Sequence, residues 1–439
     1  MTAVLQNIRA ELDLRCDGLG QILSGFAQRP LSDYLRYISK NDQSTSETAK
    51  YYRKYVIAAA RKLNAAGKYF QNIDVDVALN SLWNHPIIFT APHSQLLPER
   101  FTLAGYSAGL ATSYANSNRV CWMLACATVR LQVARREGPG WLPYRGQVLK
   151  VFGLPTRQLK WRRVCSPGQK LTFAHGELCL QNDQFQSLIG DISGDVATDL
   201  FQEANRRLVG YCIRRDGPKI IDLDERFTAW VIAEHLESGQ TPIHALILSD
   251  KISSRYKQIL AKLQVSYDSR SLRFPTEHLW AIDSAGHLVA LRRSNGYFVS
   301  ASDGKPIVPC HTTELVAGLR SGMLLPSIFL SYFAMGYLPS LNLAGGVRQA
   351  FYMTAYLKIW RHLHAAYNTV EAQQHALPKL NLWAENALDV SEDLAGSFFD
   401  HTDLSLDEWI NNAQKLPLSE TSRNFCTIIE HDYFRISST

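Results

Sequence analysis

The sequence predicts an α/β or α+β fold in which a mixed sheet is flanked by helices. Residues 87–90, 120–132 and 148–152 are rich in β-branched and aromatic side chains, which favours strands. Between the first two runs, residues 103–118 are rich in Ala, Ser and Gly, a composition suited to a helix packed closely on a sheet. Strands separated by a helix are typical of an α/β core.

The first 80 or so residues are expected to form helices, because apolar side chains recur there at helical intervals. One such series is Leu31, Leu35 and Ile38. The polar stretch 41–46 predicts a loop, after which Ser46 or Thr48 can start the next helix. A hydroxyl oxygen at that position accepts a hydrogen bond from a backbone N–H that the helix leaves free.

The middle of the chain predicts further helices at 186–215, 224–237 and 249–263. Residues 278–293 have the clearest hairpin pattern, with turn residues at 283–286 between two alternating runs. Residues 297–308 are expected to add a second pair of strands. From residue 312 onward the chain is expected to return to helix, including residues 391–434.

These elements suggest three regions. They are a helical N-terminal segment at 1–80, an α/β core at 81–310 and a mainly helical C-terminal region at 311–439. We expect the third region to pack on the core rather than to fold independently.

No charged residue lies between Arg320 and Arg348, and this stretch is long enough to span a bilayer. Pro326, Pro339 and a glycine pair divide it into shorter pieces. We therefore expect a buried helix followed by a loop, with no membrane span.

Composition narrows the class of protein. The formal net charge of +6, from 46 basic and 40 acidic residues in a chain of 439, is a mild excess without a concentrated basic patch, so we expect no nucleic-acid partner. The eight cysteines are scattered, without a CxxC pair, and the N-terminus lacks a continuous apolar signal segment. A cytoplasmic protein with free thiols is expected.

The first candidate site is the loop that follows the predicted strand at 87–90. It carries His93, Ser94 and Glu99, which we take as candidate catalytic residues. A histidine after a buried strand suits a metal ligand or a general base, and His85 is a second, weaker candidate ligand. The alternative is that His93 only hydrogen-bonds the backbone of its loop.

The second candidate site is the glycine pair near residue 345. Gly345 and Gly346 precede a predicted helix, so backbone N–H groups there can face an anion, and Arg348 can hold a carboxylate by two hydrogen bonds. Gln349 belongs to the same motif, and Trp141, presented by a rigid Gly-Pro-Gly turn, is a further candidate for substrate binding. The alternative is a glycine turn between buried helices, with Arg348 as a structural ion.

A third motif, Gly105-Tyr-Ser-Ala-Gly109, matches the nucleophile elbow of serine hydrolases, with residues 101–104 as its strand and Ser107 as nucleophile. The preceding strand lies too close in sequence for the crossover that this fold requires. Small residues at helical spacing make a packing stripe an equally good interpretation.

Other histidines carry weaker predictions. His175 and Glu177 alternate along a predicted strand, where they face either a cleft or solvent. His235 lies among glutamates near a predicted helix end, which indicates a surface position.

Several short motifs spaced along the chain resemble a family of bacterial proteins encoded beside siderophore and nonribosomal-peptide genes. The motifs are His85-Pro, Thr90-Ala-Pro-His93, Gly138-Pro-Gly-Trp-Leu142, Val151-Phe-Gly-Leu154, Leu325-Pro-Ser327 and Gly345-Gly-Val-Arg-Gln349. Some members of that family are implicated in making graminine, a diazeniumdiolate amino acid derived from arginine. The resemblance implies biosynthesis on an amino-acid-like substrate, and it carries over no catalytic residue.

The sequence of residues 86–94 also resembles the N-terminal motif of N-formylglutamate amidohydrolases, whose strand-end histidine binds zinc. Those enzymes usually carry glycine after His-Ser, and this chain has Gln95 there, which puts the zinc role of His93 in doubt.

Together these patterns and the resemblance predict a cytoplasmic bacterial enzyme of specialised metabolism that acts on a small amino-acid-like substrate, at a site that gathers residues 85–99 with Arg348 and the Gly345-Gly346 turn. Metal-dependent oxidative chemistry is one reaction class open to it. Iron and zinc are the candidate cofactors, and other biosynthetic enzymes and a second copy of the chain are candidate partners. The alternatives are a metal-dependent amide hydrolase, a serine hydrolase using Ser107 and a non-catalytic member of a biosynthetic complex.

Overall fold

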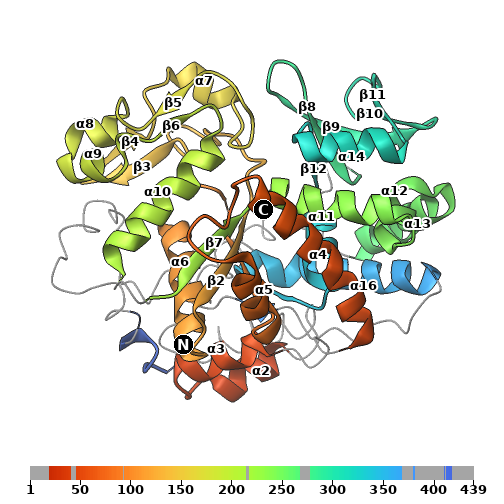
Figure 1. The fold of residues 1–439 in the computed structure, drawn as a ribbon, viewed down its shortest axis with the longest axis horizontal. Helices are drawn as coiled ribbons and strands as arrows, with labels where there is room; N and C mark the ends of the chain where they lie inside the picture. The colour runs from red at the N-terminus through yellow and green to blue at the C-terminus, as the bar shows by residue number, and fades with distance from the viewer. Residues whose placement is uncertain are drawn as a thin grey trace.

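A five-stranded parallel sheet forms the centre of the molecule (Figure 1). The computed structural model describes residues 19–40, 46–91, 93–213, 217–266, 277–367, 379–380, 410 and 412–417. The strand order is β14 (Lys379–Leu380), β13 (Asn342–Gly345), β1 (Ile87–Ala91), β2 (Val120–Ala125) and β7 (Lys219–Leu223), and every neighbouring pair is parallel. Together with the helices and a separate antiparallel sheet, this confirms the predicted fold class.

The parallel sheet is covered by helices on both faces, which explains why its strands are mostly apolar. In β2, for example, Cys121 and Met123 join one hydrophobic cluster, while Trp122 and Leu124 join another on the opposite face. This alternation follows from the two-residue period of a strand.

One face is covered by helices α3 (Leu31–Ser39), α6 (Arg100–Ala115) and α10 (Ala197–Cys212), with α2 (Leu19–Phe26) packed on α3. Helix α6 approaches the sheet closely because Gly109 has no side chain. A Cβ atom there would lie 2.5 Å from Cys121 Sγ. The small residues of α6 therefore set how near it lies to β2.

The other face is covered by α4 (Glu47–Ala65), α5 (Val75–Asn84), α11 (Glu225–Ser238) and α16 (Val347–Tyr367). Around them lie α12 (Pro242–Leu248), α13 (Asp250–Ser266) and α14 (Thr312–Ser321). The predicted start of α4 is confirmed, because Ser46 Oγ accepts a hydrogen bond of 3.1 Å from the backbone N–H of Ala49.

The antiparallel sheet contains the predicted hairpins. Its strand order is β11 (Pro306–Pro309), β10 (Tyr297–Ser300), β9 (Leu288–Ser294), β8 (Leu279–Ile282) and β12 (Leu324–Pro326). Strands β8 and β9 are the hairpin expected at 278–293, and β10 and β11 are the pair expected at 297–308.

The chain between β2 and β7 makes a lobe of short elements before α10. They are β3 (Trp141–Tyr144), β4 (Gln147–Lys150), α7 (Thr156–Trp161), β5 (Leu171–Thr172), α8 (Glu177–Gln181), α9 (Asp183–Ile189) and β6 (Ser193–Gly194). In Figure 1 this yellow lobe and the teal antiparallel sheet stand on opposite sides of the upper part of the molecule. The single helix expected at 186–215 is therefore interrupted by β6, and Glu177 begins a helix rather than lying in a strand with His175.

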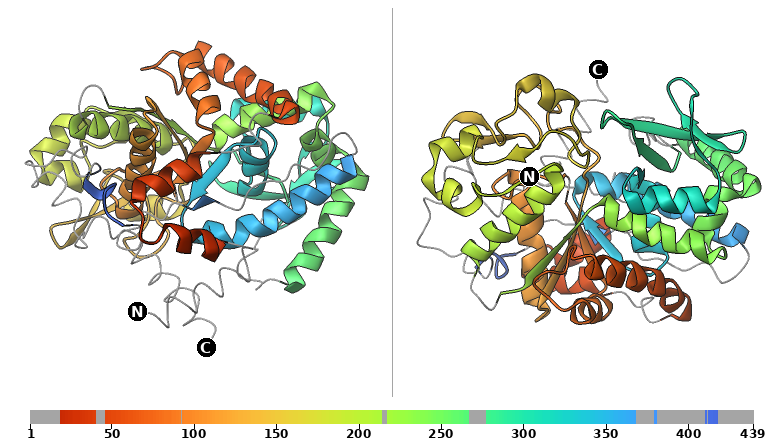
Figure 2. Two further views of the ribbon diagram at one scale, coloured as in Figure 1. Left: turned by 90° about the horizontal axis from the view of Figure 1, so that it is seen from below. Right: turned by 45° about the horizontal axis from the view of Figure 1, so that its top comes forward.

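The uncharged stretch before Arg348 contributes one strand to each of the two five-stranded sheets. It forms β12, the short helix α15 (Ile328–Tyr332), a π-helical turn η2 (Phe333–Tyr337) and then β13. In both views of Figure 2 the light-blue strand β13 lies at the centre of the molecule, among strands from the first half of the chain. The core sheet thus continues across the boundary expected at residue 310. Among the described helices, none combines the length and apolar character needed to cross a bilayer.

His235 corrects an expectation about the surface. It is fully buried in α11, where its ring lies 4.0 Å from that of Tyr55 and 6.0 Å from that of Tyr52. Burial lowers the pKa of His235 to about 3, so the imidazole is neutral. The residues 391–434 that were expected to be helical lie outside the described residues, apart from a few at 410–417.

Candidate functional site

The order of the strands marks one position at the carboxyl edge of the parallel sheet. From β1 the chain adds β2 and then β7 on one side, and it later adds β13 on the other side of β1. The order therefore reverses between β1 and β13. In open parallel sheets, ligands bind outside the carboxyl ends of the strands at such a reversal.

Both segments singled out from the sequence end at this position. The His93 loop follows β1, and Gly346 follows β13 and precedes α16. Phe89 pairs with Ala344 in the parallel register, so Ala91 and Gly346 come at the same level as the two strands leave the sheet. Two loops about 250 residues apart in the sequence thus meet at one edge.

Gly345 and Gly346 have different surroundings. A Cβ atom on Gly345 would lie 1.5 Å from Gln349 Oε1 and 2.2 Å from Thr90 Oγ1, so a side chain there would displace the Gln349 amide. Gly346 is exposed and its backbone dihedral φ is not positive. Apart from its chain neighbours, no atom of the described residues lies within 4 Å of the Cβ position. Space therefore remains in front of Gly346 at the start of α16.

The side chain of Gln349 links strands β1 and β13. Its Oε1 accepts a hydrogen bond of 2.7 Å from the hydroxyl of Thr90, and its Nε2 donates to the carbonyl of Leu343 at 2.9 Å. The amide is buried and engaged at both ends, so it supports the β1–β13 contact. Arg348 lies in the first turn of α16, but its side chain is outside the part of the chain that the structure describes.

The His93 loop is held by backbone contacts to neighbouring elements. The N–H of Ser94 donates to the carbonyl of Cys126 at 2.8 Å, and the N–H of Leu97 donates to Oδ1 of Asn205 in α10 at 2.7 Å. Ser94 is buried, whereas His93 is half-buried at the end of β1. The loop thus holds the backbone of His93 at the carboxyl edge.

Glu99 begins helix α6 as its N-cap. Its carboxylate accepts hydrogen bonds of 2.9 Å from both the N–H and the hydroxyl of Thr102. Gln95 also donates to this carboxylate. The structure therefore gives Glu99 a capping role that ties the end of the His93 loop to α6.

The carboxyl edge also holds a group that sequence reasoning missed. Cys126 and Thr128 follow β2, and Glu225 opens α11 directly after β7. Glu225 is 4% exposed and accepts hydrogen bonds from the N–H of Ala127 at 2.7 Å and from the hydroxyl of Thr128 at 3.0 Å. The sequence signal that could have identified this group is the position of Cys126 and Glu225 just after the predominantly apolar runs that form β2 and β7.

Burial sets the charge states of this group. It raises the pKa of the Cys126 thiol well above its usual value, and the nearby Glu225 carboxylate raises it further. Burial also raises the pKa of Glu225, although the N–H of Ala127 partly offsets this. The resting thiol therefore keeps its proton beside an acceptor.

A buried ion pair closes the end of β7. Asp224 caps α11 and accepts hydrogen bonds from the guanidinium of Arg226 and from the hydroxyl of Tyr69 at 3.1 Å. Burial alone would raise the pKa of Asp224, but the Arg226 charge lowers it below its ordinary value. The carboxylate is thus ionised and fully engaged, which fixes where Glu225 begins.

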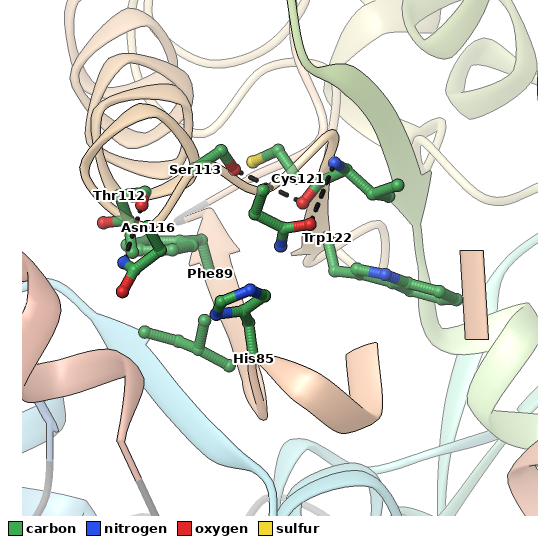
Figure 3. Close-up of a pocket in the computed structure, with 10 residues that line it drawn as sticks. His85, Phe89, Thr112, Ser113, Asn116, Cys121 and Trp122 are labelled. Atoms are coloured by element: carbon green, nitrogen blue, oxygen red, sulfur yellow. Dashed lines mark hydrogen bonds between the residues drawn. The ribbon is translucent and has the colours of Figure 1, made fainter. Parts of the chain in front are cut away.

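His85 lies at the opposite, amino end of the sheet. It ends α5 and lines a pocket of about 10 Å³ between β1, β2 and α6, which has room for about one water molecule. Figure 3 shows its imidazole between Asn116 and Trp122. Strand β1 separates His85 from His93, so the structure does not bring these two candidate ligands together.

Trp141 and Ser107 are placed in the core. Trp141 lies in β3, and its side chain belongs to the hydrophobic cluster of the lobe. Ser107 is fully buried in the middle of α6, and residues 101–104, expected as a strand, are part of the same helix. The strand–turn–helix context of a nucleophile elbow is therefore absent at 100–115, which favours the packing stripe.

The described residues contain no cluster of three or more His, Cys, Asp or Glu side chains suited to holding a metal ion. Comparison of the sequence with protein-family models and with curated proteins found no match.

Proposed function

We propose that this chain is an enzyme that modifies a small amino-acid-like molecule at the carboxyl edge of its parallel sheet. The observation that carries the proposal is the reversal of strand order between β1 and β13, where the His93 loop and Gly346 lie at the same level. A scaffold of this kind positions loops for binding and chemistry while its core stays rigid.

The start of α16 is suited to the carboxylate of such a substrate. Its first turn contains no acidic residue, and its backbone N–H groups carry the positive end of the helix dipole. Gly346 leaves room for an anion to approach them. The Arg348 side chain belongs to the same turn in sequence and adds a positive charge.

His93 supplies acid–base chemistry in this proposal. An imidazole changes its charge near neutral pH and can remove or return a proton beside the bound molecule. Iron or zinc, the metals suggested for oxidative or hydrolytic chemistry, would make His93 a ligand instead. Elemental analysis of protein purified without added metal separates these roles, because a ligand role requires a stoichiometric metal that His93→Ala loses.

A matched pair of variants tests the anion site. Gly346→Asp places a negative charge before α16, and Gly346→Asn places a neutral side chain of the same shape there. Both residues are favourable at a helix start, so both proteins are expected to fold. With L-arginine and N-formyl-L-glutamate as probes in calorimetry, Asp should weaken binding about tenfold or more, and Asn less than about threefold.

Equal affinities of the Asp and Asn variants would overturn the placement of the carboxylate. Binding of neither probe to the wild-type protein would overturn the amino-acid-like substrate class.

A further inference from the structure

Three side chains at the carboxyl ends of β2 and β7 form a chain of hydrogen-bonding groups. Cys126 Sγ lies 3.4 Å from Thr128 Oγ1, and Thr128 Oγ1 lies 3.0 Å from Glu225 Oε1. The Thr128 hydroxyl donates its one proton to Glu225, so its free lone pair accepts from the Cys126 thiol. The order of donors therefore runs from sulfur to carboxylate.

The acceptor end of this chain is held rigidly. Glu225 is buried at the first position of α11 and also accepts from the N–H groups of Ala127 and Thr128, at 2.7 and 3.3 Å. These two residues directly follow Cys126. The backbone that carries the thiol and the carboxylate that faces it are thus fixed to each other.

The donor end lies beside the proposed substrate site. Strands β1 and β2 pair in parallel with Ala91 opposite Ala125, and the N–H of Ser94 donates to the carbonyl of Cys126 at 2.8 Å. The half-buried Cys126 therefore follows the same edge as His93.

We propose that Cys126 is a nucleophile for acyl transfer, activated through the Thr128 hydroxyl by Glu225 as the general base. This inference rests on the proposed function and names its reaction class, the cleavage of an amide or ester of the small substrate. A thiol that keeps its proton at rest is a poor nucleophile, so such a cysteine needs a base within reach.

The proposed reaction needs no reactant besides the substrate and water. The thiol proton passes to Thr128 as the Thr128 proton passes to Glu225, the sulfur bonds to the carbonyl carbon, and the bond to the leaving amine or alcohol breaks. Glu225 returns the proton to that leaving group by the same route. Water then hydrolyses the thioester, which releases the acid and restores the thiol.

Other ionisable groups lie close enough to influence the pair. Tyr332 of α15 and Tyr352 of α16 interact electrostatically with Cys126, as does Arg163. Burial raises the pKa of both tyrosines above the ordinary value, so they are neutral, and Arg163 is the positively charged group of the three.

The test uses p-nitrophenyl acetate, whose acyl group carries no carboxylate. We expect a burst of p-nitrophenol of about one equivalent and an acetyl group on Cys126 in peptide mass spectra, as for an acyl-enzyme. Cys126→Ala should abolish both. Thr128→Val, which keeps the shape without the hydroxyl, should slow the burst about tenfold or more, and Thr128→Ser should restore it to within about threefold.

A burst that persists in Cys126→Ala, or one that Thr128→Val leaves unchanged, would overturn the proposal. Iodoacetamide labelling of the half-buried Cys310 serves as an internal control, because its rate should be the same in every variant if the fold is kept. Calorimetry of the wild-type protein with L-arginine and N-formyl-L-glutamate reports on the substrate site, and the burst reports on the nucleophile, so failure of the one and failure of the other give different results.

Discussion

Among single residues away from the carboxyl edge of the sheet, Asp222 in β7 carries a buried carboxyl group whose charge state affects stability. Its Oδ2 accepts a hydrogen bond from the hydroxyl of Tyr106 in α6, and its buried Oδ1 has no hydrogen-bond partner among the described residues. Burial raises the pKa of Asp222 to about 7, with a smaller contribution from Asp224. The carboxyl is therefore protonated in the folded protein below neutral pH.

The sign of the effect on stability follows from this shift. The folded-state pKa lies above the value of an unfolded chain, so the protonated group contributes stability that is complete at acidic pH and is lost as the pH rises through about 7. Asp222→Asn, which cannot ionise, should therefore gain stability relative to the wild type between pH 5 and pH 9. We expect a difference on the order of 2 kcal/mol.

Urea unfolding of both proteins at these two pH values measures the difference. An exposed acid, Asp303, supplies the control variant Asp303→Asn, which should show no such gain. If the free energy of unfolding falls by the same amount between these two pH values in the wild type and in Asp222→Asn, the assignment of a protonated Asp222 is contradicted.

At the scale of elements, helix α6 shows how one motif can support two opposite interpretations. Gly105-Tyr-Ser-Ala-Gly109 matches a catalytic pattern, yet it lies within a 16-residue helix against β2. Gly109 is the point of closest approach, and Ser107 Oγ is buried with no hydrogen-bond partner among the described residues. The motif serves packing in this structure.

Two substitutions on α6 separate packing from catalysis. Gly109→Ala adds a methyl group 2.5 Å from Cys121 Sγ and should destabilise the protein by about 2 kcal/mol through overpacking. Ser107→Ala removes an unsatisfied hydroxyl, so its stability should stay within about 1 kcal/mol of wild type or rise. Thermal unfolding and a fluorophosphonate label measure both effects, and strong labelling of wild type that Ser107→Ala abolishes would restore the serine-hydrolase alternative.

At the scale of the whole molecule, the sequence predicts what depends on neighbours along the chain. The Ser46 cap and the hairpin at 278–293 are local patterns, and both are confirmed. The glycine pair was expected to share one substrate site with the 85–99 loop, but how the fold forms that site was not predicted. It depends on the pairing of β1 with β13, whose sequences do not identify each other as partners.

Burial was the second feature that local patterns could not supply. His235 lies between Glu234 and Glu237, which indicated a surface, yet α11 packs its imidazole against two tyrosines. Glu234 is itself almost buried and pairs with Lys62 and Arg320 at 2.6 and 2.8 Å. Cys126 and Glu225 were missed because each is unremarkable alone, and only the strand order brings them together.

We propose that small amino-acid-like molecules bind at the carboxyl edge between β1 and β13. Photolabelling with a diazirine-bearing amino acid, followed by peptide mass spectrometry, locates the bound molecule directly. We expect labels within 91–99, 126–128 and 345–349 that excess L-arginine or N-formyl-L-glutamate prevents. Labels that the same two compounds prevent, but that lie at the His85 pocket or in the open groove of about 490 Å³ beside Pro30, Arg36 and Lys415, would contradict this placement.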